Sequence, residues 1–269
     1  MAALLRWWLA PAFELLPTDY VAETSYSAKL WSRQTISSAA EESESIVRRR
    51  DETLTSRDGH SIIQGDSHWL TSAGVVFFET VNLYGVDRSN RQNMAGYGNA
   101  DRSGQYLFPP NIEKKRYGLW DPDYAGPRVV TFDHVDKFRG VTVYVFNSLA
   151  DGIDETTGFE SLPDVPEKYH ALSYGKGRLW IEPISGVVVD WEDAGMSYFV
   201  ETKTGERVGE PMARWSAHYT AETIKAQLQR ATAAHGWIRA LEVWLPLTFA
   251  AAGLIWIAAG FCIPRRGAR

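Results

Sequence analysis

One segment near the C-terminus limits what this chain can fold into more than any other feature. Residues 243–263 read VWLPLTFAAAGLIWIAAGFCI, a run of 21 residues without a charged side chain. As an α-helix such a run rises about 30 Å, which is the thickness of the hydrocarbon core of a bilayer. The sequence therefore predicts one transmembrane helix at 243–263, preceded by a domain outside the bilayer.

Residues at both ends of this segment support the prediction and give it a direction. Pro246 lies in the first turn, where a helix does not need the missing amide hydrogen, and Trp244 lies near one membrane boundary. Positive charge beside a spanning helix is retained on the cytoplasmic side. We therefore predict a cytoplasmic tail at 264–269 and an extracytoplasmic domain before the anchor. The predicted anchor residues are Val243, Trp244, Pro246, Gly253, Gly260, Ile263, Arg265 and Arg266.

The N-terminal residues 1–16, MAALLRWWLAPAFELL, are apolar but contain Arg6 and Pro11. They are too short and too interrupted to span a bilayer comfortably, and they show no small-residue cleavage site. We interpret them as a truncated first transmembrane helix or as a signal-like segment lying in the membrane interface. The protein is accordingly predicted to be single-pass, or two-pass if the true N-terminus is longer.

Charge and cysteine content exclude several classes of function for the domain before the anchor. Three of the 28 basic residues and none of the 33 acidic residues follow residue 242, so residues 1–242 carry a formal charge of −8. An acidic domain without a basic stripe does not match a nucleic acid backbone. The sole cysteine, Cys262, lies in the anchor, which excludes an intramolecular disulfide, a cysteine-based zinc site and a thiol nucleophile in the domain.

The first half of the domain contains β-prone runs at 21–33 and 61–81. In the second run we expect a buried strand to use Val75, Phe77 and Val81. Residues 37–50 are rich in serine and glutamate and end in three arginines, a pattern more typical of a solvated helix or edge than of a binding patch. Residues 85–104 are crowded with glycine, asparagine and aspartate, so we predict a long loop or tight turns.

The second half reads as consecutive hairpins. RVVTFDHV pairs with GVTVYVFN across 136–139, RLWIEPIS pairs with GVVVDWED through a turn at 183–186, and MSYFVETKT precedes ERVGEPMARWSAHY, with a turn at Thr204 and Gly205. The predicted fold class is mainly β (α+β), with a curved antiparallel sheet or partial barrel over 17–219. From Thr220 helical spacing returns, which predicts a juxtamembrane helix at 220–242.

No sequence motif indicates a catalytic site or a bound cofactor. The six histidines form no metal-ligand pattern, and neither a G-x-S-x-G elbow, a P-loop nor a complete G-x-G-x-x-G is present. We therefore predict a non-enzymatic protein without a metal or cofactor. An enzyme is a third hypothesis, for which the candidate polar cluster is Asp87, Arg88, Asp101, Arg102 and Asp121. Turn formation and salt bridges between loops are the preferred interpretation of these residues.

The segment 101–122, DRSGQYLFPPNIEKKRYGLWDP, together with GVTVYVF and LWIEPISGVVV further on, resembles the PorA-type porin family of bacterial membrane proteins. The resemblance implies an N-terminal and a C-terminal transmembrane helix around a β-rich external domain, anchored in a bacterial cytoplasmic (inner) membrane. Separately, the hairpin LWIEPISGVVVDW is similar to a strand-turn-strand unit of half-barrel lipid carriers of bacterial envelopes.

Two hypotheses follow from these patterns. The first is a membrane-anchored envelope domain that binds a lipid, a glycan or a partner protein, because the concave face of a curved sheet suits an apolar ligand. The second is a channel or transporter accessory subunit that oligomerises through small residues of its helix at 250–253 and 258–260. The lipid bilayer is the one partner that both require. The sequence indicates no oligomeric state.

Overall fold

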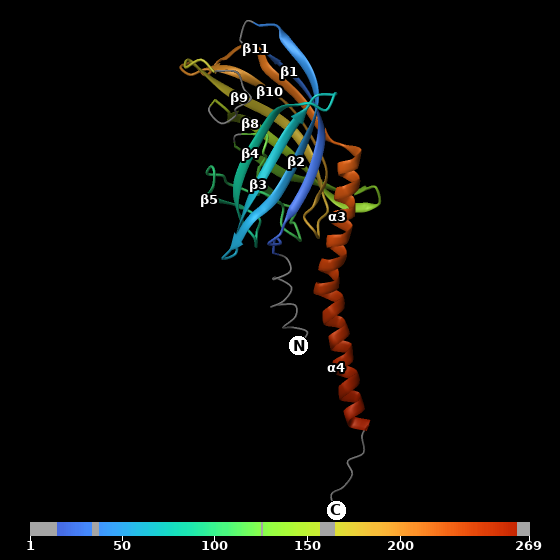
Figure 1. Cartoon of the computed structure of the whole chain (residues 1–269). Helices are drawn as coiled ribbons and strands as arrows, with labels where there is room; N and C mark the ends of the chain where they lie inside the picture. Colours follow the sequence, from blue (N-terminus) through green and yellow to red (C-terminus); the bar gives the residue numbers. More distant parts are fainter. Residues whose placement is uncertain (1–14, 34–37, 125, 157–164, 263–269) are drawn as a thin grey trace, which may run out of the picture.

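The computed structural model describes residues 15–33, 38–124, 126–156 and 165–262 of the chain. In this part of the chain a single antiparallel sheet of 11 strands curves around a common interior, with α3 beside it (Figure 1). The strands are β1 Val21–Arg33, β2 Ala40–Arg57, β3 His60–Leu70, β4 Val76–Asp87, β5 Asn93–Gly98, β6 Arg116–Trp120, β7 Pro127–Phe138, β8 Val141–Asp154, β9 Tyr169–Ile181, β10 Val188–Glu201 and β11 Arg207–Tyr219.

The strand order makes this sheet a nearly closed barrel. Two meanders, β1 to β5 and β6 to β11, join side by side where β1 pairs with β11. The remaining edges, β5 and β6, approach each other through Gln105, which forms one bridge to Gln92 and another to Leu119. The predicted fold class, mainly β with a curved sheet or partial barrel, is therefore confirmed.

Two-residue turns set the register of two of the hairpins. Arg57 pairs with His60 and Phe138 pairs with Val141. Between them Asp58 and Gly59 have φ values of 52° and 83°, and Arg139 and Gly140 have values of 48° and 86°. Positive φ at both central residues is the geometry whose twist matches that of the flanking strands.

The prediction of a solvated helix or edge at 37–50 is wrong for its described part. Residues 40–50 belong to β2, which lies inside the sheet between β1 and β3. The alternating charges have partners on the outer face of the barrel, where Lys29 lies 2.6 Å from Glu44 and Arg50 lies 2.6 Å from Glu23. Cross-strand ion pairs make a charged strand compatible with a solvated sheet face.

The predicted inward face of β4 is also wrong. Val75, Phe77 and Val81 are 62%, 54% and 58% exposed, whereas Tyr84 and Val86 are buried. The side-chain period of a strand is two, so a register displaced by one residue turns the whole apolar set outward. The pairing of β4 with β3 is regular from Phe78 to Asp87 and places Tyr84 opposite the buried Ile63, so Val81 lies on the outward face.

Two element boundaries also differ from the prediction. The region 85–104 is not only loop, because it holds the end of β4 and the whole of β5. GVVVDWED and MSYFVE form one continuous strand, β10, and not two. The turns predicted at 183–186 and at Thr204–Gly205 connect β9 to β10 and β10 to β11.

The helical region begins where the sequence predicts it. The Thr220 side chain caps α3 (Ala221–Arg239) by accepting a 3.2 Å hydrogen bond from the Thr223 amide. A π-helical turn, η2 (Ala240–Trp244), connects α3 to α4 (Leu245–Cys262). Ala231 and Leu228 pack on the outer face of the barrel against a cluster that contains Val143 and Val145.

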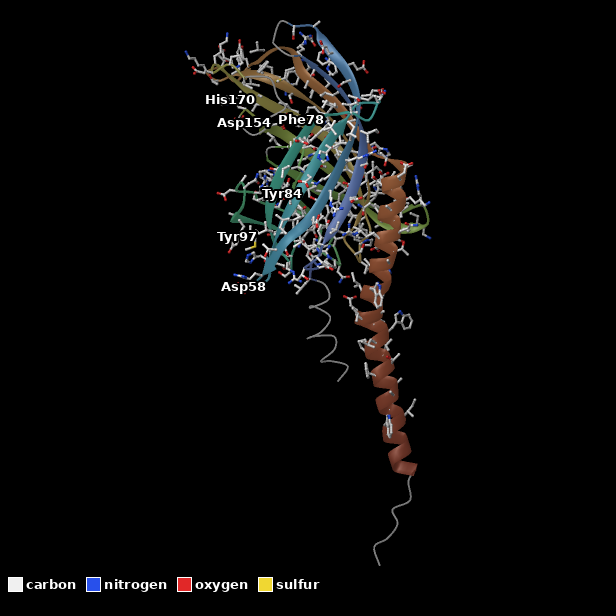
Figure 2. All side chains as sticks on the ribbon, in the orientation of Figure 1. Asp58, Phe78, Tyr84, Tyr97, Asp154 and His170 are labelled. Atoms are coloured by element: carbon white, nitrogen blue, oxygen red, sulfur yellow. The ribbon has the colours of Figure 1, made fainter. Side chains whose placement is uncertain are left out.

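Beyond the barrel, α4 extends away from the sheet, and its described side chains project into open space (Figure 2). The helix Ala221–Trp256 is long and apolar enough to cross a membrane by length and composition. Trp244 is 63% exposed. The predictions for residues 1–14 and for Ile263, Arg265 and Arg266 lie outside the described residues.

Candidate binding cavity

The barrel wall changes from strand to helix at one seam. β11 ends at Tyr219, which pairs with Tyr26, so residues 21–25 of β1 have no strand neighbour on that side. Residues 188–191 of β10 are open in the same way, because its pairing with β11 begins at Glu192. α3 contacts both β1 and β10 and fills the gap between them.

Polar contacts fix α3 in this seam. The Thr223 hydroxyl donates to the Ser25 carbonyl and accepts from the Ser25 amide, both at 2.8 Å. Lower on the helix, His235 Nδ1 lies 2.8 Å from the buried carboxylate of Glu182. In η2, the Glu242 carboxylate accepts a 2.9 Å hydrogen bond from Asn111. The helix is therefore held along its length by side chains of the barrel.

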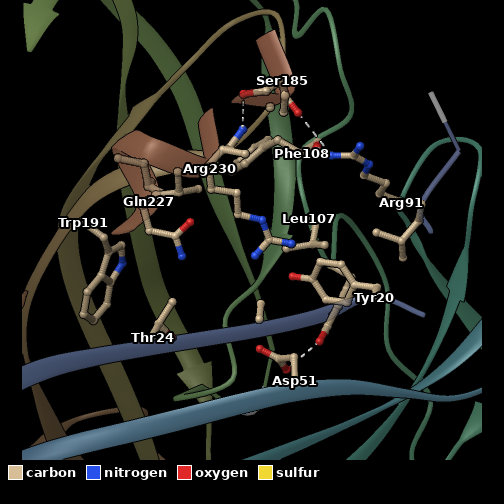
Figure 3. A pocket seen from close by; sticks show the side chains of 18 of the residues that line it. Tyr20, Thr24, Asp51, Arg91, Leu107, Phe108, Ser185, Trp191, Gln227 and Arg230 are labelled. Atoms are coloured by element: carbon tan, nitrogen blue, oxygen red, sulfur yellow. Dashed lines mark hydrogen bonds between the residues drawn. The ribbon is translucent and has the colours of Figure 1, made fainter. Parts of the chain in front are cut away.

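A cavity of about 390 Å³ lies behind α3 (Figure 3). Its walls come from β1, from α3, from the start of β10 and from the segment 105–123 that leads into and out of β6. Its volume lies within the range of pockets that hold small ligands. Its lining extends to Leu16 and Pro17, at the start of the described chain, and to Trp237 and Ile238, near the end of α3 that leads to α4.

One part of the cavity lining is apolar. Leu107 and Phe108 come from the segment that crosses the barrel end, and Trp191 comes from β10. Further along α3, Ala234, Trp237 and other apolar side chains form the outer part of the wall. The apolar lining includes Leu16, Pro17, Leu107, Phe108, Pro110, Leu179, Val187, Val188, Trp191, Ala234, Trp237 and Ile238.

The other part of the lining is polar. Gln227 and Arg230 extend from α3, and Thr24 faces them from β1 (Figure 3). The Arg230 guanidinium stacks over the Tyr20 ring at 5.0 Å from its centroid. Burial raises the pKa of Tyr20 to about 12, while the positive charge of Arg230 acts in the opposite direction.

Arg49 and Asp51 in the cavity wall neutralise each other. Their closest atoms lie 2.6 Å apart, and the Tyr106 hydroxyl donates a 2.6 Å hydrogen bond to the same carboxylate. The Arg91 guanidinium donates to the carbonyl oxygens of Phe108, at 2.8 Å, and Ser185, at 3.3 Å. These arginines thus fix the wall of the cavity.

Beyond the cavity a buried ionic network fills the barrel interior. Arg128, which is 1% exposed, lies 3.0 Å from Asp121 and 2.5 Å from Asp193. Tyr124 and Trp215 each donate a 2.8 Å hydrogen bond to Asp193. Burial acts to lower the pKa of Arg128, but the nearby charges, Asp121 first, outweigh it and hold the pKa above its usual value.

Glycines on the inner faces of β9 and β10 give this network its space. A Cβ atom on Gly175 would lie 2.3 Å from the Tyr124 hydroxyl, and one on Gly177 would lie 2.9 Å from the Asp193 carboxylate. On Gly195 it would lie 2.3 Å from the Trp215 ring. The interior is thus closed by side chains that require these glycines.

Asp123 connects the network to the cavity. Its carboxylate accepts a 2.6 Å hydrogen bond from Tyr26, and its amide donates to Asp121 at 3.1 Å. Burial first, and the charge of Asp121 second, raise the pKa of Asp123 to about 7. This carboxyl group therefore changes its charge near neutral pH, in the wall of the cavity.

The structure distributes the candidate polar cluster over separate contacts. Asp87 accepts hydrogen bonds from Ser89 and Asn90, Arg88 donates to the Leu16 carbonyl, Asp101 accepts from the Gly96 amide, and Arg102 donates to Leu83, Asn82 and Asn99. Asp121 belongs to the Arg128 network. No hydrogen bond or ion pair joins any two of the five within the described ranges. A functional role for them stays a prediction.

Sequence reasoning missed Gln227, Arg230, Thr24 and Trp191. The first two had a signal, because they lie on the helix between the buried positions Ile224 and Ala231. Polar residues on the buried stripe of an amphipathic helix indicate that the stripe faces something other than a packed core. Thr24 and Trp191 are ordinary strand residues, and the sequence shows nothing that marks them.

The model of the porin PorA family matches residues 1–262. The chain belongs to this family. The family resemblance based on residues 101–122 is therefore confirmed. No curated protein matches the chain. Porins are membrane proteins, so family membership supports the predicted membrane association. That the protein is non-enzymatic stays a prediction.

Arg128→Met is expected to destabilise this PorA family member by about 3–5 kcal/mol, because it leaves two buried carboxylates without their cation. Arg178→Met removes an exposed arginine that lies 3.4 Å from Glu192 and is expected to cost about 0–1 kcal/mol. Denaturant unfolding of the full-length protein in detergent measures both. Equal costs for the two variants would contradict the role given to Arg128.

Asp123→Asn is expected to change how stability depends on pH. The folded pKa of about 7 is above the ordinary value of 3.8, so the folded protein holds the proton more tightly. The stabilisation from this proton is complete below pH 3.8 and is lost as the pH rises through about 7, by up to about 1.4 kcal/mol per pH unit. The variant should therefore gain stability over the wild type at about pH 8 and lose that gain near pH 5.

Melting temperatures across this pH range test the prediction for Asp123. Asp19→Asn, which removes an exposed carboxylate, is the control. If Asp123→Asn and Asp19→Asn gave the same pH profile of melting temperature, titration of Asp123 would not explain the pH dependence of stability.

Proposed function

We propose that this PorA family member is a membrane-anchored, extracytoplasmic protein that binds a membrane lipid in its barrel. The observation that carries the proposal is the cavity of about 390 Å³ behind α3, beside the helix that is apolar enough to enter a bilayer. A ligand that leaves the membrane surface along α3 would meet the mouth of this cavity first.

The outer surface of the barrel supports a location in water. The ion pairs of Lys29 with Glu44, of Arg50 with Glu23 and of Arg178 with Glu192 lie on its outer face. A barrel that spans a membrane has an apolar outer band instead. The bilayer contact is therefore assigned to α4, with residues 243–263 as a single-pass anchor.

Topology follows from the charges after the anchor. Arg265 and Arg266 follow the apolar segment, and such residues are retained on the cytoplasmic side. We place the tail in the cytoplasm and the barrel on the opposite side of the bacterial cytoplasmic membrane. A cysteine-accessibility assay in intact cells tests this placement, and labelling of a barrel cysteine only after lysis would contradict it.

The lining of the cavity favours a lipid over a glycan or a partner protein. Its outer wall presents Trp237, Ile238 and Pro110, which suit hydrocarbon chains. A glycan site would place polar groups at the entrance, and a protein partner would use a flatter surface than this cavity offers. We accordingly assign the lipid.

A channel or transporter accessory role is the second candidate, because the family is described as a porin family. In the described structure the barrel interior is filled by the Arg128 network and by Phe108, Phe146 and Tyr117. Conduction would therefore require an assembly of α4 helices or displacement of these side chains. Planar bilayers containing the full-length protein are expected to show no channel currents, and reproducible unitary currents would favour this second role.

Ala234→Trp is expected to reduce the lipid that co-purifies with the full-length protein by filling the cavity mouth. Ala233→Trp makes the same change on an exposed face of α3 outside the cavity and should leave the lipid content unchanged. Lipid extraction and mass spectrometry, normalised to protein, measure the effect. Equal lipid content in the two variants, or none in the wild type, would count against lipid binding in this cavity.

A further inference from the structure

The geometry points to the orientation and class of the bound lipid: an anionic, phosphate-bearing headgroup lies inside the cavity against Arg230 and Gln227. The acyl chains leave past Trp237 toward the membrane. This inference rests on the proposed function, because it describes how the same cavity holds its lipid. The added claim is that the protein binds the lipid through its headgroup.

The order of residues along α3 gives the direction. The cavity-lining positions of this helix are, in chain order, Gln227, Arg230, Ala234, Trp237 and Ile238. The chain continues from there into α4, so the polar positions lie far from the membrane helix and the apolar positions lie near it. In a lipid bound with its chains inward, the chains would lie against the polar positions and the headgroup against the apolar ones.

Gln227 favours a polar ligand in the inner part of the cavity. The residue is 8% exposed and lines the cavity, yet no protein group within the described ranges forms a hydrogen bond with its amide. Its amide atoms do not belong to the buried unpaired atoms of the described residues, so they reach the space of the cavity and can form a hydrogen bond there. A headgroup oxygen beside Gln227 would supply it.

Arg230 shows that the polar ligand is an anion. Its side chain is half-buried, and no carboxylate of the described residues lies within 4.0 Å of it. Arg49 and Arg128, in contrast, each have a carboxylate within 3.0 Å. A guanidinium presents a planar set of donors that fits a phosphate with two parallel hydrogen bonds.

The inner end of the cavity also does not suit hydrocarbon. Thr24, Tyr26 and Asp123 line it together with the two α3 residues. Tyr26 and Asp123 are hydrogen-bonded to each other, but acyl chains placed there would remove the Thr24 hydroxyl and the Gln227 amide from water without giving them hydrogen-bond partners. Trp237 is 72% exposed at the other end, where an apolar side chain and a lipid chain can contact each other as the chain enters the bilayer.

Competition between two matched lipids tests the headgroup. Native mass spectrometry of the full-length protein in detergent compares phosphatidylglycerol with a diacylglycerol of the same chains. The wild type is expected to prefer phosphatidylglycerol. Arg230→Gln should lower the affinity for phosphatidylglycerol roughly tenfold, as expected for the loss of a hydrogen bond to a charged group. It should leave the affinity for diacylglycerol nearly unchanged. Gln227→Leu should lower the affinity for phosphatidylglycerol by a smaller factor.

Arg239→Gln is the matched control, because Arg239 is exposed on the same helix and does not line the cavity. It should retain wild-type affinity for both lipids. Wild-type protein that binds both lipids equally would overturn this inference and leave lipid binding intact. Wild-type protein that retains neither lipid would overturn the proposed function itself. Inorganic phosphate that binds as tightly as phosphatidylglycerol would assign the site to a free anion and overturn the inference.

Photo-crosslinking tests the orientation independently. Phosphatidylglycerol with a diazirine midway along one acyl chain is expected to label residues 234–238 of the full-length protein. Peptide mapping identifies the labelled positions. Label concentrated near Thr24 and Tyr26 would show that the chains enter first and would overturn the proposed orientation.

Discussion

The early end of β11 is the constraint on which the rest of the structure depends. Because β11 stops at Tyr219, opposite Tyr26, the first residues of β1 and β10 face each other without a strand between them. Open strand edges carry backbone groups that need partners, and the Thr223 hydroxyl supplies two hydrogen bonds to Ser25. A helix fills such a gap with side chains and not with a backbone ladder. The cavity is the space that this replacement leaves.

The buried ionic network forms the side of the cavity opposite α3 and has a different structural role. Arg128 on β7 holds Asp121, which follows β6, and Asp193 on β10. It thereby fixes the segment that carries Asp123 and closes the inner end of the cavity. The small residues Gly175 and Gly177 admit the network at the cost of interior packing. One polar cluster therefore separates a filled barrel interior from the open cavity behind α3.

Much of the fold could be predicted from the sequence because local chemistry dictates it. The strand Val21–Arg33, the turns at 183–186 and Thr204–Gly205, and the helix cap at Thr220 depend on alternation, turn residues and capping. The predictions failed where a neighbour decides. The charged strand β2 needs the partners on β1, and the inward face of β4 is set by its register against β3, which places Tyr84 opposite Ile63. The candidate site had one readable signal, Gln227 and Arg230 on the buried stripe of α3.

The sequence by itself determined a mainly β domain followed by one helix that is apolar enough to enter a membrane, because strand alternation and an uncharged run of 21 residues are local properties of the chain. Only the tertiary structure decided that the sheet nearly closes and that α3 replaces part of its wall. It also placed Gln227 and Arg230 beside Thr24, which lies about 200 residues away in the chain. Contacts over such separations arise from the pairing of β1 with β11, and no local pattern encodes them.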